Sequence, residues 1–441
     1  MKVSIFDQYN ENTKKLLQSL ITAGITRKNL FVHYDGELPV GAMSPFTFFT
    51  NCHEKVERQD GLFFDQVAVP DWYDIRHSDG ESASIEYLKK AVGKINYRKK
   101  GYRLVDTVDW FSQENSKVVV KKDRYNLAGH HYASTYFSTV GPYRTEYYDV
   151  DGRAVIIEDL THRTIRLHRN SMIHHFENLT QFFLYFLKVA QIKVSESYIN
   201  SLSFPLFISR ALNMGNKTTL FWQENLGKDV PGNMKNELEK AEALNQIIFM
   251  KENQLIHVKK DFPTTKVKLN YLSNIGEFTR ENHFRKSAFI LTNSDNIHGL
   301  QDILQNLPEL NITVAAYTNM STKLLHMEEE FNNIKLIPSI NEERLNVELE
   351  KADIYLDINH GIKVGDILKR AYQQQMIIFS NKEVAQQGEN SLIFEDTREI
   401  CNHLSYILSD RTNWQKLLTK MVEKNGQLST IHEYKTILNL Q

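Results

Sequence analysis

The side chains with the clearest capacity for chemistry lie in two segments of the C-terminal third. Thr292–Gly299 contains Asn293, Asp295 and His298, and His360–Lys369 contains further charged residues. Each segment follows a short apolar run that predicts a buried strand, and parallel α/β sheets bind ligands beyond the carboxyl ends of their strands. A nucleoside diphosphate bound there would require cationic side chains. Because Asp295 adds a negative charge, the first segment is poorly suited to a diphosphate.

The second segment lies within Asp353–Asp396, which has the layout of a nucleotide-binding unit. The pattern predicts a strand over Ile354–Ile358, a helix over 364–374 and a strand over Met376–Ser380, with Gly388-Glu389-Asn390 before a third strand. This stretch resembles the sugar-nucleotide-binding region of retaining glycosyltransferases. Catalytic relatives carry two glutamates around the loop and the helix start, and an Arg and a Lys that neutralise the pyrophosphate. The corresponding residues here are His360 or Gly361, Leu368 or Lys369, Asn293 and His298. The resemblance therefore implies a degenerate donor site and no catalytic residue.

An alternative is an active retaining UDP-sugar glycosyltransferase with non-standard donor-site residues. Asp366 lies close enough to the start of the expected helix to replace one carboxylate. Lys363 or Lys369 could meet a phosphate. The sequence leaves this alternative open.

The elements that position these residues predict a doubly wound domain over residues 266–441. Strands and helical segments alternate, and connections of this length require right-handed crossovers and a parallel sheet. The expected strands are Ala288–Thr292, Ile312–Tyr317, Ile334–Ile337, Ile354–Ile358, Met376–Phe379 and Leu392–Phe394. We also consider that the last helix crosses back to the first domain.

The N-terminal part begins a second α/β unit and then breaks its rhythm. Val3–Phe6 predicts a strand, Asn12–Ala23 an amphipathic helix and Asn29–His33 another strand. The pattern returns with a helix over Glu177–Ala190 and later strands such as Lys217–Trp222. We therefore predict one Rossmann-like domain split between residues 1–58 and 171–265.

The intervening residues 59–170 predict an inserted antiparallel meander. Asp151-Gly152 is the strongest hairpin signal in the chain. Strict alternation would place Val108 and Trp110 on one face, and Val105 and Thr107 on the other. The insert thus adds an extended β-sheet domain to an otherwise α/β protein.

The insert has the composition of a docking surface. Ser84–Asn170 carries 16 Lys and Arg against 10 Asp and Glu, and aromatic residues lie on both expected faces. Aromatic and arginine side chains dominate protein interfaces, although a solvated sheet with lysines at its edges is an equal alternative. The residues proposed for a partner interface are Phe63, Phe64, Trp72, Tyr73, Trp110, Tyr136 and Tyr147.

Composition excludes several other classes. The 441 residues have a formal net charge of -1, which argues against a nucleic-acid partner. The N-terminus turns polar too early for a secretory signal, and the apolar run Phe182–Leu187 is too short to span a bilayer. Cys52 and Cys401 lack CxxC spacing, which favours incidental thiols in a reduced cytoplasmic protein. The sequence contains no metal-ligand or cofactor motif, so we expect no metal and no cofactor.

Four segments together resemble one known family. They are Ile5–Asn10, Ser44–Phe49, Leu62–Ile75 and Asp106–Trp110. The chain is similar to the glycosyltransferase-stabilising proteins of the accessory Sec system. That family implies a GT-B-like fold, with two Rossmann-like domains and an extended β-sheet domain inserted in the first.

The resemblance also implies the partners. It implies a non-catalytic subunit that binds a catalytic peptide O-GlcNAc transferase, as a heterodimer or heterotetramer. The partner would transfer GlcNAc from UDP-GlcNAc to a serine-rich repeat acceptor, which this subunit helps to hold. Recognition of already glycosylated repeats is a further alternative. The implied location is the cytoplasm, with weak peripheral attachment of the basic sheet to anionic lipid left open.

Overall fold

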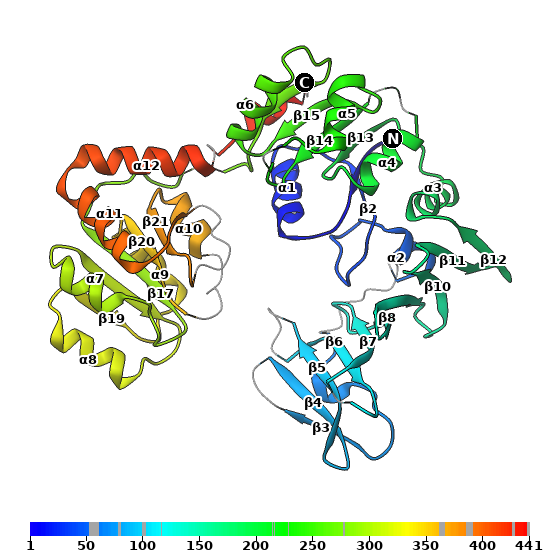
Figure 1. Ribbon diagram of the computed structural model, residues 1–441, viewed down its shortest axis with the longest axis horizontal. Coiled ribbons are helices and arrows are strands. Elements are labelled where there is room, and N and C mark those ends of the chain that lie inside the picture. Colours follow the sequence, from blue (N-terminus) through cyan, green and yellow to red (C-terminus); the bar gives the residue numbers. More distant parts are fainter. Residues whose placement is uncertain are drawn as a thin grey trace. The chain divides into compact units, whose positions relative to one another are not determined.

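The computed structural model describes residues 1–52, 61–77, 81–98, 103–115, 117–213, 215, 217–227, 229–276, 278–360, 367–384, 391–425 and 428–438. The chain forms two compact units (Figure 1). One comprises Met1–Ile248 with Val258–Asn270, and the other Phe249–His257 with Tyr271–Gln441. In the described part, no helix combines the length and the apolar character that crossing a bilayer requires.

A six-stranded sheet in the order β16-β15-β14-β13-β1-β2 forms the first Rossmann-like part. The strands are β1 (Lys2–Phe6), β2 (Lys28–Phe31), β13 (Glu196–Ile199), β14 (Thr218–Trp222), β15 (Leu244–Phe249) and β16 (Lys268–Tyr271). The accompanying helices are α1 (Glu11–Thr22), α2 (Pro45–Phe49), α3 (Leu179–Val189), α4 (Phe204–Ala211), α5 (Gly232–Lys240) and α6 (Glu252–Asp261). β2, β1, β13 and β14 pair in parallel. The expected split of this sheet by an insert is thereby confirmed.

The N-terminal helices form where the sequence supplies caps and apolar stripes. Asn10 caps α1 by accepting a hydrogen bond from the Thr13 amide, which satisfies one of the free donors at a helix start. Asn178 caps α3 in the same way. Phe182 and Phe186 of α3 are fully buried, so this helix is held by its packing.

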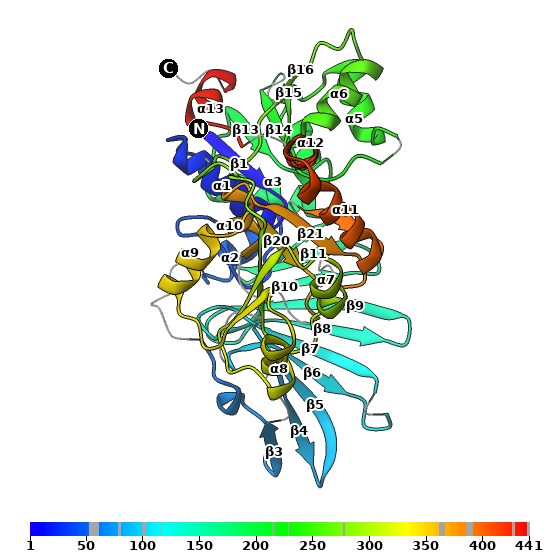
Figure 2. The same ribbon diagram turned by 90° about the vertical axis from the view of Figure 1, so that its left-hand side faces the viewer.

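The insert is a ten-stranded antiparallel meander, and strands β4 to β9 lie side by side in Figure 2. After a 3-10 turn (Phe64–Gln66), its strands are β3 (Tyr73–His77), β4 (Ser82–Tyr87), β5 (Lys90–Tyr97), β6 (Val105–Phe111), β7 (Val119–Tyr125), β8 (His131–Ser138), β9 (Gly141–Tyr148), β10 (Ala154–Asp159), β11 (Thr164–Arg169) and β12 (Met172–Phe176). The Asp151-Gly152 hairpin joins β9 to β10 as expected. β12 carries the sheet past the boundary expected at Asn170.

One expectation about the faces of this sheet is wrong. A register shift where Tyr97 pairs with Val105 breaks the alternation of β6. Val105 and Val108 consequently lie in the same hydrophobic cluster, although strict alternation placed them on opposite faces. A β-bulge adds one residue to one strand and so reverses the facing of the residues beyond it.

Aromatic side chains join the meander to the first Rossmann-like part. The Phe46 ring of α2 lies 4.3 Å from that of Tyr147 on β9 and 5.7 Å from that of Phe182 on α3. Phe49, which is also on α2, packs against Phe182 and Phe186 of α3. Aromatic pairs at these centroid distances add to the free energy of burial. The insert therefore packs against the helices of the first sheet, and the connecting chain is not its sole attachment.

The second unit contains a parallel sheet in the order β19-β18-β17-β20-β21-β22. Its strands are β17 (Ser287–Thr292), β18 (Asn311–Ala316), β19 (Ile334–Ile337), β20 (Ile354–Asp357), β21 (Ile377–Asn381) and β22 (Leu392–Phe394). Its helices are α7 (Leu300–Asn306), α8 (Thr322–Glu330), α9 (Glu342–Glu350), α10 (Ile367–Gln373), α11 (Thr397–Ser409), α12 (Arg411–Asn425) and α13 (Ile431–Ile437). All six expected strands are confirmed. The exact domain boundaries and the crossing of the last helix stay predictions.

Candidate functional site

The loops that follow β17 and β20 lie side by side in the second unit. The His298 amide donates to the Ile358 carbonyl at 2.7 Å, and the His360 amide donates to the Asn296 carbonyl at 2.9 Å. The two imidazole rings lie 5.6 Å apart, edge to face. The His298 ring is 3.8 Å from the Glu383 carboxylate. The structure therefore brings together two of the six residues expected at the degenerate donor site.

The other expected donor-site residues that the structure describes differ in their burial. Leu368 is only 6% exposed and belongs to the hydrophobic core of the unit. Lys369 on α10 and Asn293 after β17 are exposed. Gly361 lies outside the described residues, as do Lys363 and Asp366 of the alternative hypothesis. Across the described ranges, no three His, Cys, Asp or Glu side chains are grouped so that they could hold a metal ion.

Gly299 is the last residue of the loop after β17, and its substitution is expected to change the stability of the protein. Its φ is +66°, and a Cβ there would lie 2.2 Å from the Thr397 hydroxyl oxygen. We expect Gly299→Ala to lower the free energy of unfolding by about 3 kcal/mol, because left-handed strain adds to overpacking. Gly24→Ala is the control, since its φ is +77° but nothing lies within 4 Å. Urea unfolding measures both variants, and equal losses would contradict the role of Thr397.

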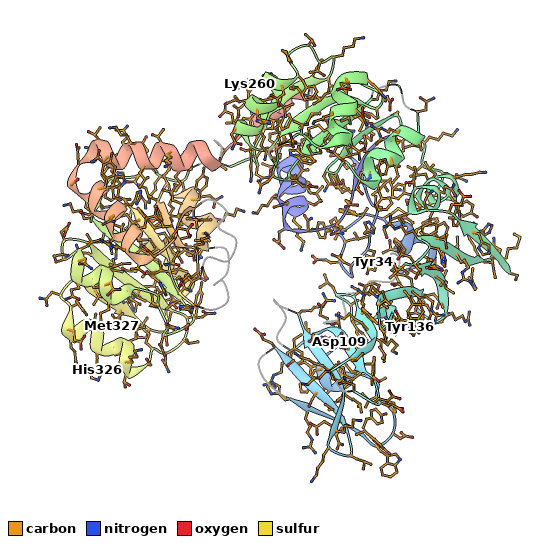
Figure 3. The ribbon with its side chains drawn as sticks, viewed as in Figure 1. Tyr34, Asp109, Tyr136, Lys260, His326 and Met327 are labelled. Carbon is orange, nitrogen blue, oxygen red and sulfur yellow. The ribbon has the colours of Figure 1, made fainter. Side chains whose placement is uncertain are left out.

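Four side chains form a row across one face of the meander, which we call the aromatic–cation row. Trp110, Lys121, Tyr136 and Arg144 are successive cross-strand neighbours on β6, β7, β8 and β9. Lys121 lies 5.5 Å from the centre of the Trp110 ring, and Arg144 lies 4.6 Å from that of Tyr136. All four are half-buried, and Figure 3 labels Tyr136 on β8. Such a pre-ordered set of cation–aromatic pairs is typical of interface anchors.

A buried carboxylate beneath the row fixes the Trp110 ring. Asp123 accepts a hydrogen bond from the Trp110 indole at 2.6 Å and one from the Ser134 hydroxyl. Burial alone would raise the pKa of Asp123, but hydrogen bonds from His131 and Ser134 bring it to about 2. The carboxylate is therefore charged at neutral pH. Glu146 holds the other end of the row, because it accepts from the Tyr136 hydroxyl at 3.1 Å.

Two other residues expected at the partner interface share a hydrophobic cluster with one end of the row, because Phe64, Tyr73 and Trp110 all pack against it. The Phe63 ring lies 5.0 Å from that of Phe64. Trp72 precedes β3 and is 88% exposed. Tyr147 lies on the opposite face from Tyr136 because it is three residues from Arg144 on the same strand. Its packing on Phe46 separates it from the row.

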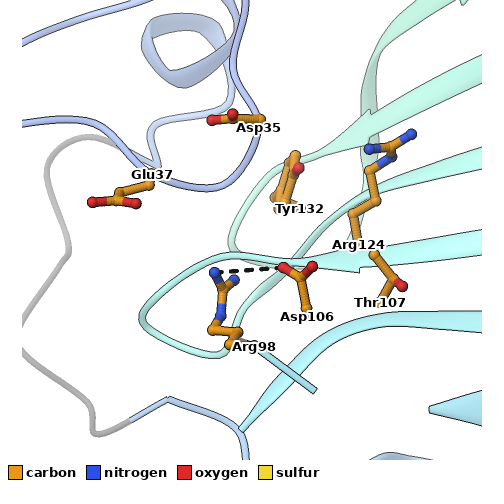
Figure 4. A pocket seen from close by; sticks show the side chains of 7 residues that line it. All are labelled: Asp35, Glu37, Arg98, Asp106, Thr107, Arg124 and Tyr132. Carbon is orange, nitrogen blue, oxygen red and sulfur yellow. Dashed lines mark ion pairs between the residues drawn. The ribbon is translucent and has the colours of Figure 1, made fainter. Parts of the chain in front are cut away.

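A cavity that sequence reasoning missed lies where the loop after β2 meets the meander (Figure 4). It has two adjoining lobes of about 320 and 400 Å³, which share Asp35, Arg124 and Tyr132. Asp35 comes from the loop, whereas Arg124 and Tyr132 come from β7 and β8. No local motif could signal this site, because its walls are about 90 residues apart in the chain.

Family models match most of the chain in four blocks. They are the GtfB N-terminal domain over residues 3–49, the GtfB middle domain over 73–177, the GtfB third domain over 179–260 and the GftB/GlyA-F C-terminal domain over 288–421. The middle-domain match spans the ten strands of the meander.

Individual relatives and solved structures agree with these matches. The UDP-N-acetylglucosamine–peptide N-acetylglucosaminyltransferase stabilizing protein GtfB of Streptococcus agalactiae is 32% identical over 99% of this chain and 98% of its own. The protein of the same description from Streptococcus parasanguinis is 31% identical over 91% of this chain and 90% of its own. A chain in the crystal structure of a GtfA/B complex bound to UDP and GlcNAc matches with a TM-score of 0.81 and 28% identity, covering 100% of this chain and 99% of that one.

A more distant solved structure supports the fold alone. TarM matches with a TM-score of 0.50 at 12% identity, over 100% of this chain and 98% of its own. Together with the two parallel sheets and the inserted meander, the structural matches confirm the expected GT-B-like fold. The near full-length identity to the streptococcal relatives places this chain in the family of UDP-N-acetylglucosamine–peptide N-acetylglucosaminyltransferase stabilizing proteins.

Proposed function

We propose that this chain is the non-catalytic stabilising subunit of a protein O-GlcNAc transferase complex. It binds the catalytic glycosyltransferase and a Ser/Thr-rich acceptor, to which the partner attaches GlcNAc from UDP-GlcNAc. The observation that carries the proposal is the full-length similarity to stabilizing proteins and to a chain of the GtfA/B complex. Partner binding is assigned to the meander, whose aromatic–cation row has the chemistry of an interface.

The transfer step is assigned to the partner. At the positions where catalytic relatives carry glutamates, Leu368 is part of the hydrophobic core and cannot contact a donor from there. The neighbouring Lys369 is a cation and cannot replace a carboxylate. The backbone amides of His298 and His360 each donate a hydrogen bond to a carbonyl of the neighbouring loop. These features support a scaffold that has kept its fold without the usual donor chemistry.

A transfer assay separates this proposal from an active transferase. The purified chain is mixed with radiolabelled UDP-GlcNAc and a Ser/Thr-rich peptide, alone and after co-expression with the catalytic subunit. We expect no transfer by the chain alone and robust transfer by the complex. Transfer by the chain alone, lost in Asp366→Ala or Lys369→Ala, would establish the alternative. Unchanged solubility and activity of the partner without this chain would contradict a stabilising role.

A further inference from the structure

The two-lobed cavity forms a groove across the meander, which we call the junction groove. On the meander its lining runs from Asp106 and Thr107 on β6 to Glu158 on β10. It therefore crosses five neighbouring strands, a distance of about 19 Å at the usual spacing between strands. About six residues of extended polypeptide have that length. A single monosaccharide or nucleotide would leave most of the groove empty.

The charges in the junction groove disfavour an anionic ligand. Four carboxyl groups line it, from Asp35, Glu37, Asp106 and Glu158, against the guanidinium groups of Arg98 and Arg124. Arg98 already lies 3.5 Å from the Asp106 carboxylate. A phosphate or an acidic peptide would meet an excess of negative charge. A ligand rich in hydroxyl and amide groups meets both donors and acceptors.

Of the two arginines that line the groove, Arg124 is the one available to a ligand, because Arg98 is paired with Asp106. It is half-buried and lies between the two lobes. Within the described residues its guanidinium forms no hydrogen bond or ion pair. A guanidinium offers five donors in a planar fork, and in a groove of this shape main-chain carbonyl oxygens of a bound peptide are suitable acceptors.

The walls next to Arg124 offer partners for hydroxyl groups. Thr135 and Thr145 face each other across β8 and β9, with their hydroxyl oxygens 3.1 Å apart. Asp35 and Glu158 add carboxylate oxygens that accept hydrogen bonds from hydroxyl groups.

His33, which follows β2, also lines the groove. Its ring nitrogen Nε2 lies 3.5 Å from the Asp7 carboxylate. Burial lowers the pKa of His33 and raises that of Asp7, whereas the attraction between the two groups opposes both shifts. The His33 ring is therefore a further polar group in the wall of the groove.

We propose that the junction groove holds an extended, uncharged Ser/Thr-rich segment of the acceptor, with Arg124 donating to its main-chain carbonyls. The inference rests on the proposed function, since it names where and how the acceptor binds. It places acceptor recognition between the loop after β2 and one face of the meander. The aromatic–cation row lies on the other face, so partner and acceptor would use opposite sides of one sheet.

The test measures fluorescence anisotropy of a labelled peptide of about twelve Ser, Thr and Ala residues, longer than the groove requires. The full chain, in complex with its catalytic partner, carries Arg124→Ala, Arg124→Lys or the control Arg153→Ala. Arg153 lies in the β9–β10 loop with a side chain 79% exposed. We expect Arg124→Ala to raise the Kd about tenfold or more, Arg124→Lys to raise it less, and Arg153→Ala to leave it within about twofold.

A second peptide with Asp in place of each Ser should bind wild-type complex at least about tenfold more weakly. Wild-type affinity in Arg124→Ala, or equal affinity for the Asp peptide, would overturn the junction groove while leaving acceptor binding intact. No binding of the Ser/Thr peptide by the wild-type complex would overturn both this inference and the acceptor part of the proposed function. Thermal melting and partner recovery show whether each variant is folded.

Discussion

Asp353→Ala is expected to lower the free energy of unfolding of the second unit by about 3 kcal/mol. Asp353 is fully buried and accepts hydrogen bonds from the guanidinium of Arg280 at 2.6 Å and from that of Arg285 at 2.9 and 3.0 Å. It also accepts from the amides of His283 and Arg285. Its removal leaves two cations without their counter-charge. We use the low end of the range for buried pairs because the Arg285 side chain is 37% exposed.

Hydrogen exchange can confine this measurement to the affected unit. Protection of amides in β17 and β20 should fall roughly a hundredfold, whereas amides in β8 of the other unit should not change. Glu348→Ala is the matched control. Glu348 pairs with Lys335 and Lys351, whose side chains are half-exposed, so its loss should cost less than about 1 kcal/mol. Equal protection in Asp353→Ala and wild type would refute the expected role of the carboxylate.

Asp353 also determines how the stability of the second unit changes as the pH is lowered. Burial opposes ionisation of Asp353, but the hydrogen bonds from Arg285 and Arg280 outweigh it and hold the pKa below the usual 3.8. The stability that this carboxylate contributes is therefore present above that value and is lost as pH falls through the lower, folded pKa. Asp353→Ala should consequently lose less stability than wild type when the pH is lowered below about 4.

The double variant Lys121→Ala/Tyr136→Ala is expected to weaken recovery of the catalytic partner at least about a hundredfold. Both residues belong to the aromatic–cation row, and anchors of this kind contribute about 2 kcal/mol or more each to protein interfaces. The control is Lys122→Ala/Phe137→Ala. Each of these positions is the chain neighbour of one in the row and points to the opposite face.

Pull-down from co-expressing cells measures the difference between the two double variants. The row variant should lose the partner and the control should keep it, because only the facing of the side chains differs. Full recovery with both would show that the partner does not dock through the aromatic–cation row. Trp72→Ala then tests the exposed tryptophan before β3 as the alternative anchor.

The parallel sheets were predictable because their strands are short apolar runs between helical segments. The apolar run Ile354–Ile358 predicts a buried strand, and β20 forms there. The meander was predictable as a whole from its alternation and from Asp151-Gly152. Its faces were only partly predictable, because register shifts such as the one where Tyr97 pairs with Val105 reverse the facing of later residues.

The sites were less predictable than the elements. Tyr136 and Tyr147 look equivalent in sequence, yet cross-strand register places them on opposite faces. The junction groove depends on how the loop around Asp35 meets Arg124 and Glu158. These contacts depend on packing between elements that are distant in the chain, and local sequence patterns do not predict such packing. Arg124 could have been singled out only as one of many cations in a basic insert.

The position of β1 has a consequence for how the chain is made. β1 lies between β2 and β13, so one edge of it stays unpaired until Glu196 has been synthesised. At about 5 to 20 residues per second, that interval after β2 lasts roughly 10 to 30 s. During it the meander emerges and can form hairpin by hairpin from local contacts. On the ribosome the inserted sheet is thus complete before the domain that hosts it, and an open strand edge on the nascent chain needs shielding throughout that time.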